Sequence, residues 1–546
     1  MPYILAPAML LAGSALAQIP PPPAACPTGT AVGWLEGRDV RAPVFNTGSL
    51  FWRDQGSPNT YTDGAGRNQI LAASLWVAAQ FEGFLYMAGS MLGPHEFWPG
   101  PLDEFGLPPA DCSPYDRVWE IRRSDIQEFE RTGVVTERLR DWPVWAGAPV
   151  TDGDGDPHNY DVAAGDRPAL LGDQMLWWVM NDRAGDHVAS QATPLQVQVE
   201  GSAFSFDREG ALGRTTFYRF RIKRSGLLPF NQAHVGLFVY GGLGDVFDDY
   251  AGSDTTANMG YFYNADNDDA VFGESPPAVG IGILRGSGPD GAADGGDTRS
   301  LDARRMTSMF TFGSECMRTS VIAGCDATYP HGRGVGYYNM MRGRWPWGEP
   351  VTLGHSRHPS QPTPLMYPGS PPEYWSEANW DGNGSALPPG DRKIVVATGP
   401  FTIVPDQESE VVFAIVTARG RDNFDSVRAL RDDMSFVQSR AAVILTPLGP
   451  GEDRSVPETF PLAASGIFPN PVTTEAFVTL SLPEALPVTL DVVDMLGRRV
   501  AVPVFRTFEA GEHRLRVDAS ELTNGVWAWQ LRAGRFSTSG TFVVAR

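Results

Sequence analysis

The chain is predicted to be mainly β, with a large β-rich body of sandwich type followed by a small immunoglobulin-like β-sandwich domain. Three observations predict this class. Apolar and polar residues alternate in short runs near the C-terminus, turn-forming residues separate these runs at regular spacing, and the clearest segments of the body are β-branched and aromatic. The 546 residues are 42% hydrophobic, which is enough for a large core and predicts two to four domains.

The first element is a predicted signal peptide at residues 1–17. Ile4 to Leu16 form an apolar run, and Ala15-Leu16-Ala17 has the A-x-A pattern of a cleavage site. No Lys or Arg precedes this run, so either the terminal amine is sufficient or the true start lies upstream. The run is too short to span a membrane, and no other stretch approaches the ~20 apolar residues of a transmembrane helix. Residues 18–33 are predicted to be a Pro-rich linker.

Residues 34–445 are predicted to form the β-rich body, as one or two subdomains. Strands are expected at residues 215–223, 235–240 and 411–417. A helix is expected from Asp125 to Arg131, with Ser124 and Gln127 as its capping box. A second helix is indicated by apolar residues that repeat every three or four positions: Val427, Leu430, Met434, Val437, Ala441 and Ile444. Residues 446–466 have the composition of an exposed linker.

Residues 467–546 are predicted to form the C-terminal sandwich. Alternating runs predict strands at 477–482 and 488–493, around Leu515 and Val517, and at 526–531 and 541–544. Turn residues stand between them, including Ala510-Gly511 and Asn524-Gly525. Short strands at such regular spacing are typical of a compact antiparallel sandwich.

Five motifs in this segment occur in a characteristic order: Phe468-Pro469-Asn470-Pro471, Val492 to Val500, Ala510 to His513, Leu522 to Trp527 and Phe542 to Arg546. In this respect the segment resembles the type A C-terminal sorting domain of the type IX secretion system, although Trp527 stands where that family usually has Tyr. The resemblance implies export through the periplasm and across the outer membrane, with the secretion machinery as partner. The exported protein is then anchored at the cell surface or released.

Segments of the body resemble uncharacterised secreted proteins that carry the same tail, a group with no activity to transfer. The segments concerned are Phe97 to Pro101, Gly172 to Gln174 with Trp177 to Asp182, Asp248 to Tyr250 with Asp254, and Gly399 to Thr402. This second resemblance implies secretion and a β-rich body.

Charge and cysteines restrict the partners and the compartment. A net charge of −21 argues against nucleic acid or an anionic membrane as a partner, since both require a basic surface. The four cysteines form an even set in a chain that passes through an oxidising compartment, so disulfides are expected. Cys316 and Cys325 are close in sequence and are expected to pair, which leaves Cys26 with Cys112 by elimination.

The strongest chemical signal is acidic. Asp152, Asp154 and Asp156 alternate with glycines in one loop, and Asp161 and Asp166 follow. Such loops bind Ca²⁺, although this one lacks the glycine and glutamate of a complete EF-hand. Two carboxylates ~4 Å apart repel by about 4 kcal/mol at an effective dielectric constant of 20. No Lys or Arg between Val150 and Gly165 relieves that repulsion. The alternative is a solvated loop whose acids point apart.

Two further acidic clusters follow predicted strands. One contains Asp245, Asp248, Asp249 and Asp254, and the other runs from Asp266 to Asp269. Either can be a cation site or a plain turn. The predicted Ca²⁺ ligands are therefore Asp152, Asp154, Asp156, Asp161, Asp245, Asp248, Asp249 and Asp254.

Enzyme motifs are absent from the sequence: there is no G-x-S-x-G elbow, no H-E-x-x-H helix and no phosphate-binding loop. The body is therefore expected to be a calcium-stabilised binding or structural module that takes an extracellular glycan or protein ligand. The alternative is an extracellular hydrolase of polysaccharide or protein that uses an acidic pair and tryptophan-lined subsites. Acidic clusters facing a tryptophan-lined cleft would favour the hydrolase, and separate loop sites would favour the module.

Overall fold

The computed structural model describes residues 26–52, 59–93, 95–157, 159–286, 306–313, 333–353 and 361–447 of the body. In the C-terminal domain it describes residues 463–464, 467, 470, 472–482, 486–494, 498–508, 511–520, 522–534 and 536–545. The predicted signal peptide and the Cys316–Cys325 pair lie outside the described residues, as do residues 18–25 of the first predicted linker and most of the second.

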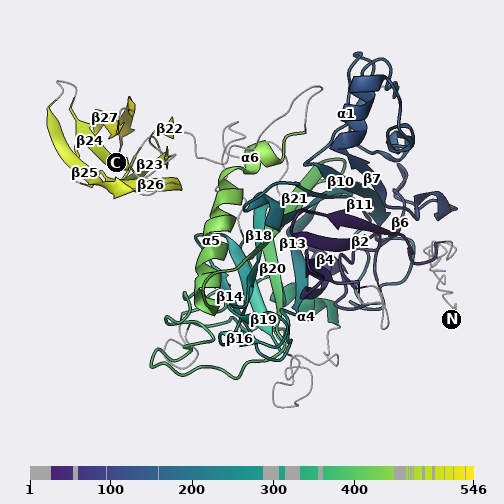
Figure 1. Ribbon diagram of the computed structural model, residues 1–546, viewed down its shortest axis with the longest axis horizontal. Coiled ribbons are helices and arrows are strands. Elements are labelled where there is room, and N and C mark those ends of the chain that lie inside the picture. Colours follow the sequence, from purple (N-terminus) through teal and green to yellow (C-terminus); the bar gives the residue numbers. More distant parts are fainter. Residues whose placement is uncertain are drawn as a thin grey trace, which may run out of the picture.

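Two antiparallel sheets form the body (Figure 1). The first has the order β1-β2-β3-β4-β13-β20-β19, with β5 paired to β4. Its strands are β1 (Val32–Glu36), β2 (Val40–Phe45), β3 (Tyr61–Asp63), β4 (Asn68–Phe81), β5 (Phe84–Ala88), β13 (Phe230–Gly241), β19 (Ser308–Phe312) and β20 (Lys393–Ile403).

The second sheet has the order β14-β15-β18-β21-β12-β11-β10-β6, with β7 paired to β10. Its strands are β6 (Trp98–Pro99), β7 (Trp119–Arg122), β10 (Gln174–Asn181), β11 (Val197–Ser205), β12 (Thr215–Arg224), β14 (Asp249–Asp254), β15 (Met259–Asn264), β18 (Ala278–Arg285) and β21 (Glu408–Ala418). Two short hairpins lie outside both sheets: β8 (Val150–Thr151) with β9 (Arg167–Pro168), and β16 (Asp268–Asp269) with β17 (Gly273–Glu274).

The second sheet is buried on both faces. Along β21, Val411 and Phe413 belong to the core shared with the first sheet, whereas Val412 and Ala414 belong to a second core on the opposite face. Successive residues of a strand point to opposite faces, so both sets are apolar and the strand has an almost continuous hydrophobic sequence. The predicted sandwich is therefore confirmed, with an additional layer on the outer face of the second sheet.

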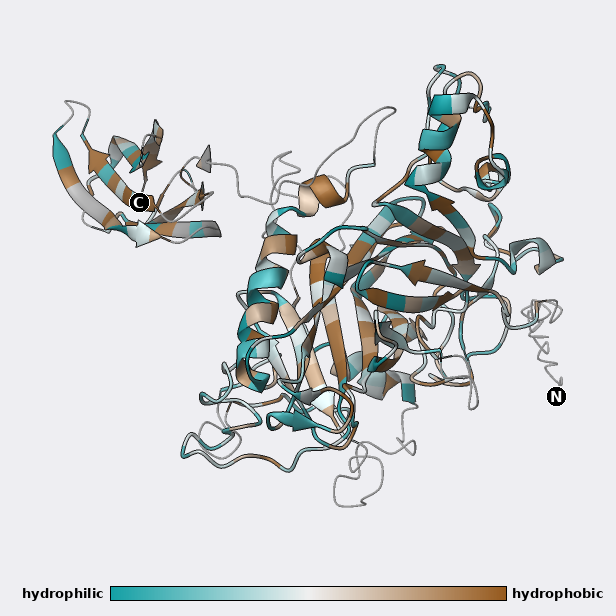
Figure 2. Cartoon of the chain, viewed as in Figure 1, coloured by the Kyte–Doolittle hydropathy of each residue, from teal (hydrophilic) through white to brown (hydrophobic). Residues whose placement is uncertain are grey.

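That layer is formed largely by α5 (Asn423–Ser439), followed by α6 (Ala441–Ile444). Leu430 and Met434 of α5 pack on β18, where the strand has Gly280 and Gly282. A Cβ added at Gly282 would lie 2.5 Å from the Met434 sulfur, so the glycines allow the helix to approach the sheet closely. In Figure 2, α5 shows alternating brown and teal residues, as expected for a helix with one apolar face.

The remaining helices of the described residues lie in connections between strands. They are the α-helices α1 (Arg123–Thr132), α2 (Glu137–Arg140) and α4 (Arg333–Met340), and the 3₁₀ helices η1 (Ser113–Tyr115), η2 (Val144–Ala146) and η3 (Leu212–Arg214). The predicted cap of α1 was wrong. The helix follows β7 directly and begins at Arg123, so its N-cap is Arg122, and the carboxylate of Asp125, the third helical residue, accepts the Arg122 N–H at 3.1 Å.

A disulfide joins Cys26 to Cys112, with their Cα atoms 5.4 Å apart. Both cysteines are buried and pack with Trp98 and Ala184 in a small cluster. The bond therefore ties the start of the described chain to the connection between β6 and β7.

The C-terminal domain has its own core between two small sheets. One sheet has the order β22 (Ala463–Ala464), β23 (Glu475–Leu482) and β26 (Gly511–Asp518). The other has the order β25-β24-β27-β28. Its strands are β24 (Leu486–Val493), β25 (Arg499–Phe508), β27 (Gly525–Ala533) and β28 (Phe536–Val544). Each predicted strand of this domain is present. Strand β25 was not predicted, because it contains Pro503 and exposes Phe505, features that an edge strand tolerates.

Candidate functional site

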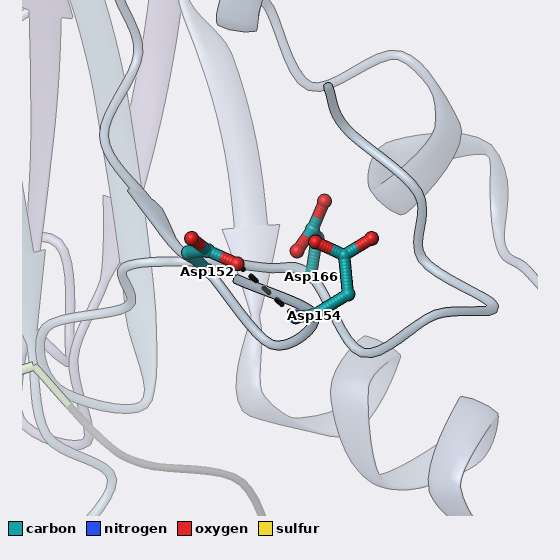
Figure 3. Close-up of side chains that lie close together, drawn as sticks. All are labelled: Asp152, Asp154 and Asp166. Atoms are coloured by element: carbon teal, nitrogen blue, oxygen red, sulfur yellow. Dashed lines mark hydrogen bonds between the residues drawn. The ribbon is translucent and has the colours of Figure 1, made fainter. Parts of the chain in front are cut away.

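The predicted acidic loop connects β8 to β9. It brings Asp152, Asp154 and Asp166 together, with one carboxylate oxygen of each residue within 4.8 Å of those of the other two (Figure 3). Asp152 and Asp154 are exposed to solvent, whereas Asp166 is buried at the base of the hairpin. Among the described residues, this is the one group of three or more Asp, Glu, His or Cys side chains that meets this criterion.

Backbone N–H groups hold the three carboxylates in place. Asp152 Oδ1 accepts the N–H groups of Asp154 at 3.1 Å and Gly155 at 2.6 Å. Asp166 Oδ1 accepts the Gly153 N–H at 2.9 Å, which closes the loop across the hairpin. Gly153 is required there, because a Cβ would lie 2.3 Å from the backbone of Gly165.

The electrostatics of this loop favour a cation. The N–H of Asp156 and the side-chain amide of Asn159 lower the pKa of Asp154, so this carboxylate is ionised at neutral pH. Each of the three carboxylates keeps lone pairs beyond these hydrogen bonds and can still bind a metal. An all-oxygen set with three carboxylates fits Ca²⁺, whose six to eight ligands commonly include carbonyl groups and water.

The two other acids predicted for this loop do not join the group of three. Asp156 donates its own backbone N–H to Asp154 Oδ1 at 2.9 Å. Asp161 Oδ1 accepts the N–H groups of Ala163 at 2.8 Å and Ala164 at 3.2 Å, as the cap of a turn. Asp166 takes the third position, which was not among the predicted ligands. The available signal was its place beside Gly165 at the end of the same glycine-rich loop.

The second predicted cluster is divided by β14. Asp249 begins this strand and Asp254 ends it, so their Cα atoms lie roughly 17 Å apart at the ordinary rise of a strand. Asp254 forms an ion pair with Arg431 at 2.5 Å, and its Oδ1 accepts the N–H groups of Thr256 and Ala257. The structure therefore does not place Asp254 with Asp245, Asp248 and Asp249.

One buried group, Glu96, His187 and Asp182, combines two acids with a histidine but includes no nucleophilic side chain. Nδ1 of His187 lies 3.6 Å from the Glu96 carboxylate, and its Nε2 lies 2.7 Å from the backbone carbonyl oxygen of Asp182. All three side chains are buried. Glu96 accepts the N–H groups of Gly89 at 2.9 Å and Ser190 at 2.7 Å, so both of its oxygens are used by the backbone. These residues join separate segments of the body and have no access to a substrate.

The tryptophans that could have formed sugar subsites are mostly in the core. Seven tryptophans of the described body are buried: Trp76, Trp98, Trp119, Trp142, Trp177, Trp178 and Trp375. Trp145 is 61% exposed and packs near Tyr115 and Trp119. Trp347 is 40% exposed and stacks on Trp345, with 5.1 Å between the ring centroids.

Two clefts of the body, of about 350 and 470 Å³, are lined by arginines and carboxylates. In the first, Arg67 is paired with Asp63 at 2.6 Å, and in the second, Arg123 is paired with Asp173 at 2.6 Å. Neither cleft contains a tryptophan or any of the predicted Ca²⁺ ligands. In these clefts, therefore, the acidic clusters do not face tryptophan-lined subsites.

Comparisons with known proteins identify the C-terminal segment. Residues 466–545 match the family described as a secretion system C-terminal sorting domain. The comparison with curated proteins found no match.

Two solved structures show weak similarity. A polysaccharide lyase has 10% identity and a TM-score of 0.20, with 72% of this chain and 38% of that chain covered. Dimeric latent PorU from Porphyromonas gingivalis has 9% identity and a TM-score of 0.14, with 73% of this chain and 33% of that chain covered. At these values neither structure informs the function of this chain.

The sorting domain establishes the destination of the protein. A type IX sorting tail directs a protein to the cell surface or the extracellular space, as predicted from the ordered motifs. Within the described residues, no helix combines the length and hydropathy needed to cross a membrane.

Proposed function

We propose that the body is a binding or structural module, presented at the cell surface or released, that calcium stabilises at Asp152, Asp154 and Asp166. The observation that carries this proposal is the convergence of three carboxylate oxygens within 4.8 Å. The segment from Val150 to Gly165 contains no cationic side chain to neutralise these acids. No residue of the loop lines either arginine-lined cleft, which is the arrangement expected of a stabilising ion rather than of a catalytic pair.

The physical reason is the repulsion among the three carboxylates. Asp166 is held at the hairpin base by its bonds to Gly153 and Asp161, so it cannot turn away from Asp152 and Asp154 without losing them. A bound cation removes this repulsion. An ion that binds only the folded state stabilises it by mass action, by about 2.7 kcal/mol at a hundredfold excess over the dissociation constant.

The test is calcium-dependent thermal unfolding of the mature chain. Calcium at ~1 mM, against a dissociation constant of ~10⁻⁵ M, should raise the melting temperature by a few degrees relative to chelator. Asp154→Asn should remove most of this increase. A matched control is Asp103→Asn, because exposed Asp103 also caps a turn, accepting the N–H groups of Phe105 and Leu107. Equal melting with and without chelator would contradict the proposal.

A further inference from the structure

A second acidic centre lies where two segments far apart in sequence meet. The connection from β13 to β14 packs against the turn that follows β15, and Asp269 joins them. Asp269 Oδ2 accepts the Asp245 N–H at 2.9 Å and the side-chain amide of Asn264 at 3.4 Å. Its Oδ1 accepts the Val271 N–H at 2.7 Å and also that of Phe272. Asp269 is buried and fully occupied, so it holds the two segments together.

Two carboxylate oxygens at this junction have no hydrogen-bond partner among the described residues. One is Oδ1 of Asp249, whose side chain is 0% exposed and whose Oδ2 accepts the Leu243 N–H at 3.2 Å. The other is the buried Oδ1 of Asp248. A buried polar atom without a partner is unfavourable, and more so when it is charged, so both oxygens require a ligand or a proton.

The surrounding charges do not neutralise them. Arg392 is close enough to lower the pKa of Asp249, but its guanidinium is held by Glu377 at 3.0 Å. The neighbouring carboxyls of Asp269, Asp245 and Asp266 add negative charge beside Asp248. The acids therefore outnumber the available cations at this junction.

We propose that a calcium ion binds at the free oxygens of Asp248 and Asp249, in a buried site whose two halves Asp269 holds together. A hard cation with oxygen ligands matches this chemistry, since Ca²⁺ also accepts carbonyl oxygens and water in an irregular shell. The site differs from the predicted cluster, because Asp254 is excluded and the support comes from Asp269. It is also independent of the exposed loop at Asp154.

Calcium stoichiometry tests this site. The mature full-length chain is stripped with chelator and titrated with calcium alone by isothermal calorimetry. The wild type should bind two ions, and Asp154→Asn and Asp249→Asn should each bind one. Asp268→Asn is the matched control, because Asp268 is an exposed acid of the same segment as Asp269 and should leave both ions. If Asp249→Asn does not fold, as judged by near-ultraviolet circular dichroism, Asp248→Asn replaces it.

The outcomes separate the two calcium proposals. If the loss occurs only with Asp154→Asn, the buried site is refuted and the loop site stands. If it occurs only with Asp249→Asn or Asp248→Asn, the loop proposal fails and the buried site stands. An Asp249→Asn chain that keeps two ions refutes the buried site. The buried site is also refuted if the wild type binds no ion there and the Asp249→Asn chain is more stable than the calcium-free wild type. In that case Asp249 is a protonated carboxyl in the wild type.

Discussion

Removing the Cys26–Cys112 disulfide should cost the body a large part of its stability. The bond joins residues 86 positions apart, so it restricts a long segment of the unfolded chain. In the chain-entropy model a loop of this length corresponds to roughly 4.5 kcal/mol at 25 °C. Both cysteines should be replaced together, as Cys26→Ala with Cys112→Ala, because a single replacement leaves a free thiol that can form other disulfides.

The assay is urea unfolding of the double variant and the wild type, both in non-reducing buffer. Reductant is unsuitable as the perturbation, because Cys316 and Cys325 are also present in the chain. The double variant should unfold at lower urea, with a free energy of unfolding lower by about 2–5 kcal/mol, the range usual for native disulfides. Unfolding midpoints that coincide would refute the reasoning, as would peptide mapping that finds Cys26 unpaired in the exported wild type.

Three other outcomes are expected. A chain ending before Ile467 should remain in the periplasm of a host with a type IX system, while the full chain is exported; equal display of both would remove the sorting role. Burial lowers the pKa of His234 to about 4 from 6.5, so the unfolded state takes up the proton first as the pH falls. The free energy of unfolding should therefore fall by roughly 3 kcal/mol between pH 6.5 and 4, and that of His234→Gln should depend less on pH over this range. Parallel pH profiles of unfolding for the two proteins would contradict this. Gly201→Ala should destabilise the body by about 1–3 kcal/mol, because the new Cβ would lie 2.2 Å from the Trp178 ring. The control Gly64→Ala, whose new Cβ would have its nearest neighbour at 3.6 Å, should have little effect. Equal urea midpoints for the two variants would show that the sheet accommodates the clash.

The buried triad of Glu96, His187 and Asp182 shows why composition alone does not identify an active site. The sequence places Glu96 and His187 in separate segments, and only the fold brings them within 3.6 Å. In this fold the two Glu96 oxygens each accept a hydrogen bond from a backbone N–H group, and all three side chains are buried. The Glu96 carboxylate therefore ties together the segments that contain Gly89 and Ser190.

The sequence by itself determined the features that depend on neighbouring residues. Alternation predicted the strand β12, and β-branched apolar composition predicted β21. The repeat from Val427 to Ile444 predicted the helical segment of α5 and α6, because side-chain periodicity sets which face is buried. The tail was predicted nearly completely, since its motifs lie within one compact domain. Its missing strand, β25, is an edge strand whose Pro503 and exposed Phe505 obscure the pattern.

Only the tertiary structure decided which acids meet. Asp166 joins Asp152 because the β8–β9 hairpin closes through Gly153 and Gly165. Asp254 is separated from Asp249 by the length of β14. If the same five positions had formed a loop, the two carboxylates could have been in contact. Carboxylate positions depend on strand length, register and loop closure, and these are set by packing between residues distant in sequence. Local patterns therefore predict the elements, and the packing of those elements selects the ligands.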